Sequence, residues 1–225
     1  MEKKYDFKET GFESYVNKDA EVIIVGVTPG NNQLGVYQNY RLSPLEIKRK
    51  YAFNGEPMRS NLINMLNHIG VNRLLGIQSC ETLWENDFHL VEMTSLLKRA
   101  TFVKANGKMF NKAEKIIGNP ELKEEFNKGF VKDCKLYNKA ILFVACGPGV
   151  YNVLMELFKK GVIKNSIIGI AHPSGQNGNW VNCYLNKKEA NSDTLRKCEN
   201  MRDDALVQLQ SLINMRIHHS SIKVD

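Results

Sequence analysis

The 225-residue chain is 43% hydrophobic and carries a formal net charge of +7, from 31 Lys and Arg against 24 Asp and Glu. This length is enough for one sizeable core, and no apolar stretch reaches the length of a membrane span. The basic balance favours an anionic partner, nucleic acid above all. The charged N-terminus lacks an apolar signal region, so we expect a cytoplasmic protein.

The five cysteines are scattered along the chain. None lies within four residues of another, which fits neither zinc nor iron–sulfur spacing. A scattered set with an odd number is typical of reduced thiols in a cytosolic protein. We therefore expect no metal and no cofactor. The residues are Cys80, Cys134, Cys146, Cys183 and Cys198.

The first half of the chain predicts two strands and two helices. The first apolar run is rich in β-branched residues and stops in a Gly/Pro turn, as buried strands of parallel sheets do. Ser43-Pro44 is typical of an N-cap followed by proline, and Gly70 of a helix C-terminus. The expected order is a strand over residues 22–27, a polar loop to 39, helices over 43–50 and 58–69, and a strand over 88–94.

The second half continues the alternation. Asn119-Pro120 predicts a further helix start, and the Cys-Gly-Pro-Gly sequence at 146–149 predicts a turn from a strand into a helix. The expected order is a helix to about residue 137, a strand over 140–145, a helix to 159, a strand over 167–171, a short extension over 180–185 and a long helix over 192–215.

This alternation predicts an α/β fold in which right-handed crossovers join the strands of a parallel sheet. We expect a single domain over residues 1–225, a three-layer α/β/α sandwich with a central four-stranded parallel sheet. Its core would occupy about residues 20–185, and a C-terminal helix about 190–215. All four strand ends carry turn or polar residues, so the carboxyl edge of the sheet is the expected functional rim.

Two of these strand ends carry the most functional information. Residues 26–30 read Gly-Val-Thr-Pro-Gly, and residues 171–174 read Ala-His-Pro-Ser. Because ligands of open α/β sheets bind past the carboxyl ends of the strands, both turns are expected to face one cleft, with His172 beside Thr28 and the backbone of Gly30. Each turn alone is weak evidence, since a lone histidine after a strand is more often a structural residue. No phosphate-binding loop and no Gly-x-Ser-x-Gly elbow occurs.

Together, strand-Gly-x-x-Pro-Gly and strand-His-Pro-Ser resemble the uracil-DNA glycosylase superfamily, in element order over about residues 22–180. The resemblance implies a monomeric DNA glycosylase that flips a damaged or modified base and hydrolyses its N-glycosidic bond without a cofactor. It implies that His172 donates a hydrogen bond to the leaving base. It also implies that Thr28, with the backbone of Pro29 and Gly30, holds the attacking water.

The first turn departs from the superfamily pattern. Active members usually carry Asp or Asn at the position of Thr28, or Ala there with a carboxylate elsewhere in the loop. Here the two positions that are acidic in the Ala-containing branch are Val27 and Gln33, so the loop holds no carboxylate. A non-enzymatic DNA-binding module and an enzyme acting on free nucleosides or nucleotides are therefore the alternatives to a glycosylase.

The resemblance also implies a base pocket. Tyr40 would stack on the flipped base, although a half-buried loop tyrosine is an equal alternative. Ser95, or Thr94 if the register shifts, would read the base edge in place of the usual Asn, and Gly30 and Gln33 would complete this side. A hydroxyl in place of an amide would not match the uracil edge with two hydrogen bonds, so a larger or modified base is the expected substrate.

DNA would be bound by the polar loop after His172 and by basic residues. The loop residues Ser174, Gln176 and Asn177 are expected to press into the minor groove. Phosphate contacts are expected from four basic side chains, although a charged run is commonly only a solvated helix face. These are Lys48, Arg49, Lys98 and Arg99.

Overall fold

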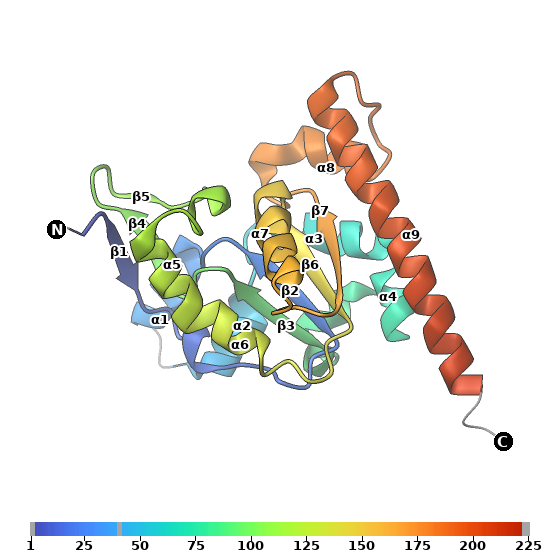
Figure 1. Ribbon diagram of the computed structural model, residues 1–225, viewed down its shortest axis with the longest axis horizontal. Helices are drawn as coiled ribbons and strands as arrows, with labels where there is room; N and C mark the ends of the chain where they lie inside the picture. Colours follow the sequence, from blue (N-terminus) through green and yellow to red (C-terminus); the bar gives the residue numbers. More distant parts are fainter. Residues whose placement is uncertain (1–2, 40–41, 222–225) are drawn as a thin grey trace.

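The computed structural model describes residues 3–39 and 42–221 and has the α/β architecture expected from the sequence. Its centre is a four-stranded parallel sheet of order β3-β2-β6-β7 (Figure 1). The pairing of Gly26 with Ser95 and of Cys146 with Ile170 aligns the carboxyl ends of the strands. These strands are β2 (Val22–Gly26), β3 (Val91–Ser95), β6 (Leu142–Cys146) and β7 (Ser166–Ile170).

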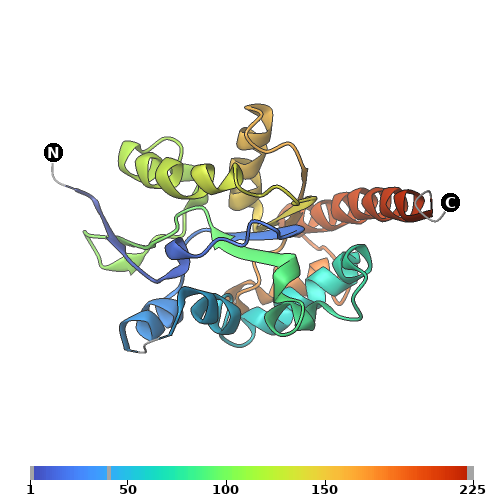
Figure 2. The ribbon, with the colours of Figure 1, turned by 90° about the horizontal axis from the view of Figure 1, so that it is seen from below.

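Helices cover both faces of this sheet (Figure 2). Alternate residues of β2 explain this, because Val22 and Ile24 belong to one hydrophobic cluster and Ile23 and Val25 to the other. The first cluster takes residues from α2 (Pro44–Tyr51), α3 (Met58–Ile69), α4 (Val71–Leu75), α8 (Gly178–Tyr184) and α9 (Asp193–Ser221). The second takes residues from α5 (Pro120–Phe126) and α7 (Pro148–Lys159). This arrangement is a three-layer sandwich.

The predicted helix starts are confirmed by their capping geometry. Ser43 and Glu46 form a reciprocal capping box at the start of α2, and the side chain of Asn119 accepts two backbone N–H groups at the start of α5. Gly70 ends α3 in the left-handed conformation that favours glycine. The helix after Asn119 continues through a π-helical turn at Asn127–Val131 into α6 (Lys132–Cys134).

Three expectations about local structure are wrong. The loop after β2 contains a helix, α1 (Asn31–Asn39), and β3 is preceded by a 3₁₀ turn over Phe88–Leu90, so it begins later than expected. The expected extension at residues 180–185 is the helix α8, where Val181 and Tyr184 have helical spacing and face the core. The Tyr184 hydroxyl donates to the Gly169 carbonyl at 3.1 Å, which fixes α8 against β7.

The structure also has a second sheet that the sequence did not predict. Three short antiparallel strands pair in the order β1-β4-β5 and lie beside the main sheet (Figure 1). They are β1 (Tyr5–Lys8), β4 (Ala100–Val103) and β5 (Lys108–Met109). Among the helices of the described ranges, none is long and apolar enough to cross a membrane.

Candidate functional site

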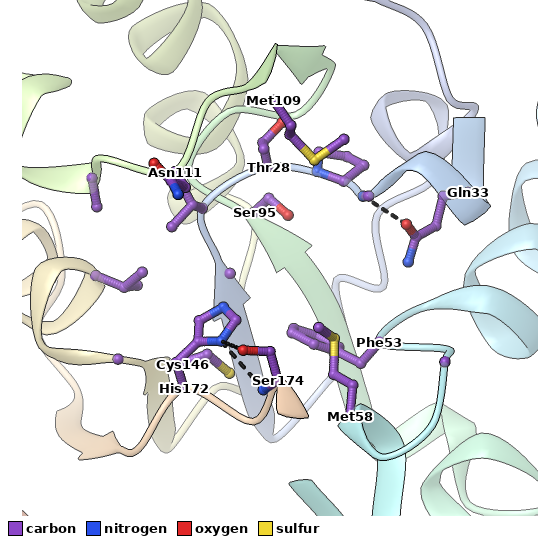
Figure 3. Close-up of a pocket in the computed structure, with 18 of the residues that line it drawn as sticks. Thr28, Gln33, Phe53, Met58, Ser95, Met109, Asn111, Cys146, His172 and Ser174 are labelled. Carbon is purple, nitrogen blue, oxygen red and sulfur yellow. Dashed lines mark hydrogen bonds between the residues drawn. The ribbon is translucent and has the colours of Figure 1, made fainter. Parts of the chain in front are cut away.

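A cavity of about 820 Å³ opens at the carboxyl edge of the main sheet. All four strand ends line it, including the turn at residues 26–30, the turn at 146–149 and the loop from His172 to Asn177. The prediction that the two key turns face one cleft is therefore confirmed. Figure 3 shows His172 and Ser174 on one side of the pocket, with Met109 and Asn111 opposite.

The hydrogen bonds of His172 determine which ring nitrogen carries its proton. The backbone N–H of Ser174 donates to His172 Nδ1 at 3.3 Å, so Nδ1 is an acceptor. The Ser174 hydroxyl lies 3.1 Å from the same nitrogen and accepts from the Asn177 amide at 2.7 Å. A neutral His172 must therefore carry its proton on Nε2, the nitrogen that faces away from Ser174 into the pocket (Figure 3).

Burial favours this neutral form. It lowers the pKa of His172 below its ordinary value, so the ring is uncharged at pH 7. His172 lies against the β6–α7 turn, because a Cβ at Gly147 would be 3.4 Å from His172 Cβ and 3.8 Å from its ring atom Cδ2, and Gly147 has a positive φ of 99°. The site therefore presents one fixed N–H donor to the cavity.

The loop after His172 is held by its own side chains and by α3. Ser174 and Asn177, both predicted DNA contacts, bond to each other and to the imidazole, so they position His172. The Asn61 amide donates to the Pro173 carbonyl at 2.9 Å. Gln176 is the exposed member of the predicted trio.

The Thr28 side of the pocket is bonded differently. The Thr28 hydroxyl donates to the Arg99 carbonyl at 2.9 Å and accepts the Thr101 N–H at 3.1 Å. Its proton is therefore committed to a protein acceptor, and the residue joins β2 to β4. The expected water-holding role of this hydroxyl is not supported by its contacts.

Gln33 and Gly30 are also bonded within the protein. The Gln33 side-chain oxygen accepts the Gly30 N–H at 2.6 Å, and its amide nitrogen donates to the Tyr51 carbonyl at 2.6 Å. The Gly30 carbonyl accepts the Leu34 N–H at the start of α1. Both residues line the cavity, but their bonds make Gln33 a positioning residue for the loop.

The strand register distinguishes Ser95 from Thr94. A Cβ at Gly26 would lie 3.6 Å from Ser95 Oγ and 3.5 Å from the Phe53 ring, so these two side chains meet over Gly26. The Thr94 hydroxyl is instead buried, and in the described part of the chain neither it nor the buried Tyr137 hydroxyl meets a hydrogen-bond partner. Both residues line the pocket, but Ser95 presents the hydroxyl to it (Figure 3).

Phe53 is a pocket residue that sequence reasoning missed. It lies between α2 and α3 and has a positive φ of 50°, a conformation rare for aromatic residues. Its ring meets Ser95 over Gly26, and in Figure 3 Phe53 and Met58 line the cavity to the right of Ser174. The available signal was the Phe-Asn-Gly sequence, typical of a turn. Tyr40, the predicted stacking residue, lies outside the described residues.

Carboxylates reach the pocket from outside the first turn. Within its described lining, they belong to Glu56 and Glu114. Glu56 accepts a hydrogen bond from the Ser60 hydroxyl at 2.8 Å. A Cβ at Gly149 would lie 3.5 Å from Glu114 Oε2, so Glu114 and His172 contact opposite ends of the turn at 147–149.

Cys146, the strand residue before this turn, offers no nucleophile, because burial raises the pKa of its thiol well above neutral.

The predicted phosphate contacts require a correction. Lys48 is fully buried and pairs with the equally buried Glu92, while burial lowers the pKa of Lys48 to about 8. Lys98 is 4% exposed and pairs with Asp133 at 2.6 Å. Both lysines are therefore buried in ion pairs, Lys48 with Glu92 of β3 and Lys98 with Asp133 of α6, and cannot contact DNA.

The two predicted arginines differ from each other. Arg99 pairs with Glu125 and lies over the Phe7 ring, with 5.1 Å from its guanidinium carbon to the ring centroid. Its charge is neutralised at the junction of the two sheets. Arg49 is exposed on α2, so its predicted phosphate contact stays a prediction.

Comparison with known proteins adds little functional information. No protein-family model matches the chain. It is similar to a Bacillus subtilis (strain 168) protein described as uncharacterized protein YoxB, with 27% identity over 205 residues that cover 85% of this chain and 79% of that protein. In residues 3–39 and 42–221, no cluster of three His, Cys, Asp or Glu side chains is placed to hold a metal ion.

Proposed function

We propose that this protein is a DNA N-glycosylase of the uracil-DNA glycosylase type, which flips a damaged or modified base into the pocket and hydrolyses its N-glycosidic bond. The observation that supports this most is the neutral His172, whose Nε2–H is fixed toward a cavity bounded by all four strand ends. A flipped base needs such a donor on the oxygen that gains charge as it departs.

In this mechanism the bond between the sugar C1′ and the base nitrogen breaks, and its electron pair goes to the base. The Nε2–H of His172 stabilises the resulting anion, a contribution of about 3–4 kcal/mol for comparable donors. The oxygen of a water molecule bonds to C1′, and the water proton passes to a carboxylate and then to solvent. Glu114 is the carboxylate that we assign to this role, because Glu56 already accepts the Ser60 hydroxyl.

The lining around Ser95 suits a base that is held mainly by stacking and apolar contact, and the amide of Asn111 lies on the opposite side of the pocket (Figure 3). Phe53, Met58, Met93 and Met109 supply aromatic and thioether surface, and Ser95 supplies one hydroxyl. One hydroxyl cannot match an amide in reading the uracil edge, so we propose a modified base as the substrate. Methionine side chains also adapt to irregular shapes, which fits a base carrying an additional group.

One observation favours a second candidate, a DNA-binding module without catalysis. The Thr28 hydroxyl and the Gly30 N–H are both bonded within the protein, so this loop presents neither donor to a water molecule. The fold and the flipping pocket would then serve to bind an altered base without excising it.

The test is a mass-spectrometric search for bases released from modified and unmodified DNA, with free nucleosides in parallel. We expect the wild-type protein to release a base from at least one modified DNA, and His172→Ala to release far less. DNA binding without release would support the second candidate. Release from nucleosides alone would contradict both proposals and indicate a nucleoside hydrolase.

A further inference from the structure

Residues 104–115, here called the lysine arm, carry an unusual charge and supply part of the pocket lining: Met109, Phe110, Asn111, Ala113 and Glu114. The arm holds Lys104, Lys108, Lys112 and Lys115 against the single acidic residue Glu114, a formal charge of +3 within twelve residues. All four lysines are exposed. In the described part of the chain, none of them has a carboxylate oxygen within 4.0 Å of its ammonium group, whereas Lys48, Lys98 and Arg99 are paired.

The arm is held in a defined position. Its hairpin pairs Phe102 with Met109, closes through the Gly107 N–H donating to the Val103 carbonyl at 2.8 Å, and continues with the Phe110 N–H donating to the Thr101 carbonyl at 2.8 Å. The lysines therefore lie on a fixed element: Lys104 at the hairpin turn, Lys108 on β5, and Lys112 and Lys115 around the 3₁₀ turn at Ala113–Lys115. Little ordering is needed for this element to bind a partner.

The segments on the two sides of the pocket differ in charge, and the four lysines lie outside the residues that line the pocket itself. Met109 and Asn111 of the arm face the pocket from the side opposite His172 and Ser174 (Figure 3). The loop at residues 174–179 on the histidine side carries no charged residue. Lys108 and Lys112 are sequence neighbours of the lining residues Met109 and Asn111, and Lys115 of Glu114. Exposed cationic side chains that no protein carboxylate neutralises, and that adjoin the wall of a cavity, are suited to the sugar-phosphate backbone that flanks a flipped nucleotide.

We propose that the lysine arm is the phosphate-binding wall of the site and that it holds the DNA backbone next to the flipped nucleotide. The inference rests on the proposed function, because it presumes DNA as the partner. The predicted phosphate contacts Lys48 and Lys98 are buried, and this proposal assigns their role to four exposed lysines instead.

The test compares two variants that lose the same charge. In the arm variant, Lys104, Lys108, Lys112 and Lys115 become Ser. In the control variant, Lys132, Lys135, Lys160 and Lys164 become Ser; these exposed lysines lie on α6, at the end of α7 and before β7, away from the pocket. The binding of a fluorescent duplex is measured by anisotropy between about 50 and 200 mM salt, the range over which phosphate contacts lose affinity most clearly.

Each phosphate contact contributes about 0.9 to the slope of log affinity against log salt. We expect the arm variant to lose a slope of about 3 or more, and at low salt to bind at least about tenfold more weakly than the control variant. If the arm variant and the control variant keep equal slopes while the wild type binds, this inference is overturned and the proposed function stands. If the wild type shows no salt-dependent DNA binding, both are overturned. Circular dichroism checks that both variants are folded.

Discussion

The two turns that meet in the pocket use their polar groups in opposite ways. In the loop after β7, three hydrogen-bonding groups from Ser174 and Asn177 surround one nitrogen of His172 and leave the other nitrogen for a ligand. In the loop after β2, the Thr28 hydroxyl donates and accepts within the protein. The loop after β7 leaves one N–H donor of His172 facing the pocket, and the loop after β2 joins the two sheets.

This comparison shows that position at a sheet edge does not define a role. Both turns follow buried strands and line the same cavity. What separates them is where each polar atom finds its partner, since a donor that is bonded within the protein is no longer available to substrate. A site assigned from turn sequences alone would have treated the two loops as equal halves.

The largest expected effect concerns Glu114, the carboxylate that we assign to the attacking water because the loop after β2 has none. Glu114→Gln should lower base release by about 10²–10⁴-fold, because general base catalysis contributes in this range. Single-turnover rates measure the change, with Glu56→Gln as the matched variant of the other pocket carboxylate. An unchanged rate of base release in Glu114→Gln would contradict the assignment of Glu114 as the group that accepts the water proton.

The next effect concerns the His172 loop. His172→Ala should reduce base release by about 10²–10³-fold at unchanged DNA affinity, since it removes a donor that acts in the transition state. His68→Ala, at a histidine of α3 that does not line the pocket, is the control. Equal losses of rate and of affinity would assign His172 to binding and contradict its proposed role.

Phe53 tests whether the aromatic surface of the pocket stacks on the flipped base. Phe53→Ala should weaken binding of a DNA carrying the substrate base by about 1–3 kcal/mol, the contribution of stacking one base on an aromatic ring. Titration of that DNA against an unmodified duplex measures the difference. Phe158→Ala, a 45% exposed residue on α7, is the matched aromatic control. Equal weakening for both duplexes would show that Phe53 does not contact the flipped base.

Thr28 is expected to affect stability more than chemistry. Thr28→Val leaves the Thr101 N–H without its partner and should lower the free energy of unfolding by about 1–3 kcal/mol. Thr28→Ser keeps the hydroxyl and should lose less. Urea unfolding measures both. If Thr28→Val were as stable as the wild type but lost base release, the comparison between the two loops would be wrong.

The smallest effect is the pH dependence of stability. Because burial lowers the pKa of His172 in the folded state, the unfolded chain binds its proton more readily. The contribution of His172 is therefore fully present above its ordinary value of about 6.5 and is lost as pH falls toward the lowered folded value, by about 1.4 kcal/mol per unit of pKa difference. In His172→Gln, the free energy of unfolding should fall less steeply as pH decreases below 6.5 than it does in the wild type. The pKa of His68 is also lowered by burial, but His68 is present in both proteins and cancels in the difference.

Local signals in the sequence predicted the main sheet and the helix ends. The apolar run at Val22–Gly26 is typical of a strand that is buried on both faces. The caps at Ser43 and Asn119 bond to backbone groups at most three residues away, so they are visible in the local sequence. The second sheet gave no comparable signal, because β1, β4 and β5 have at most four residues each and derive their stability from pairing between distant segments.

The candidate site was predictable where it depends on strand ends, as for His172 and Ser95. Phe53 and Glu114 reach it from loops whose course depends on tertiary packing, so neither stood out. From the sequence alone, Lys48 and Lys98 are expected to be exposed, because the sequence does not show that they pair with Glu92 and Asp133 in the folded protein.

The buried pair of Lys48 and Glu92 limits how this chain can change over time. Replacing either residue alone leaves an unpaired charge at the sheet edge, a loss of about 3–5 kcal/mol, whereas replacing both by apolar residues of similar volume is often neutral. The two positions are therefore expected to covary among homologues, with both charges kept or both lost. The single-substitution intermediates would rarely persist, because their loss is a large fraction of the net stability of a domain.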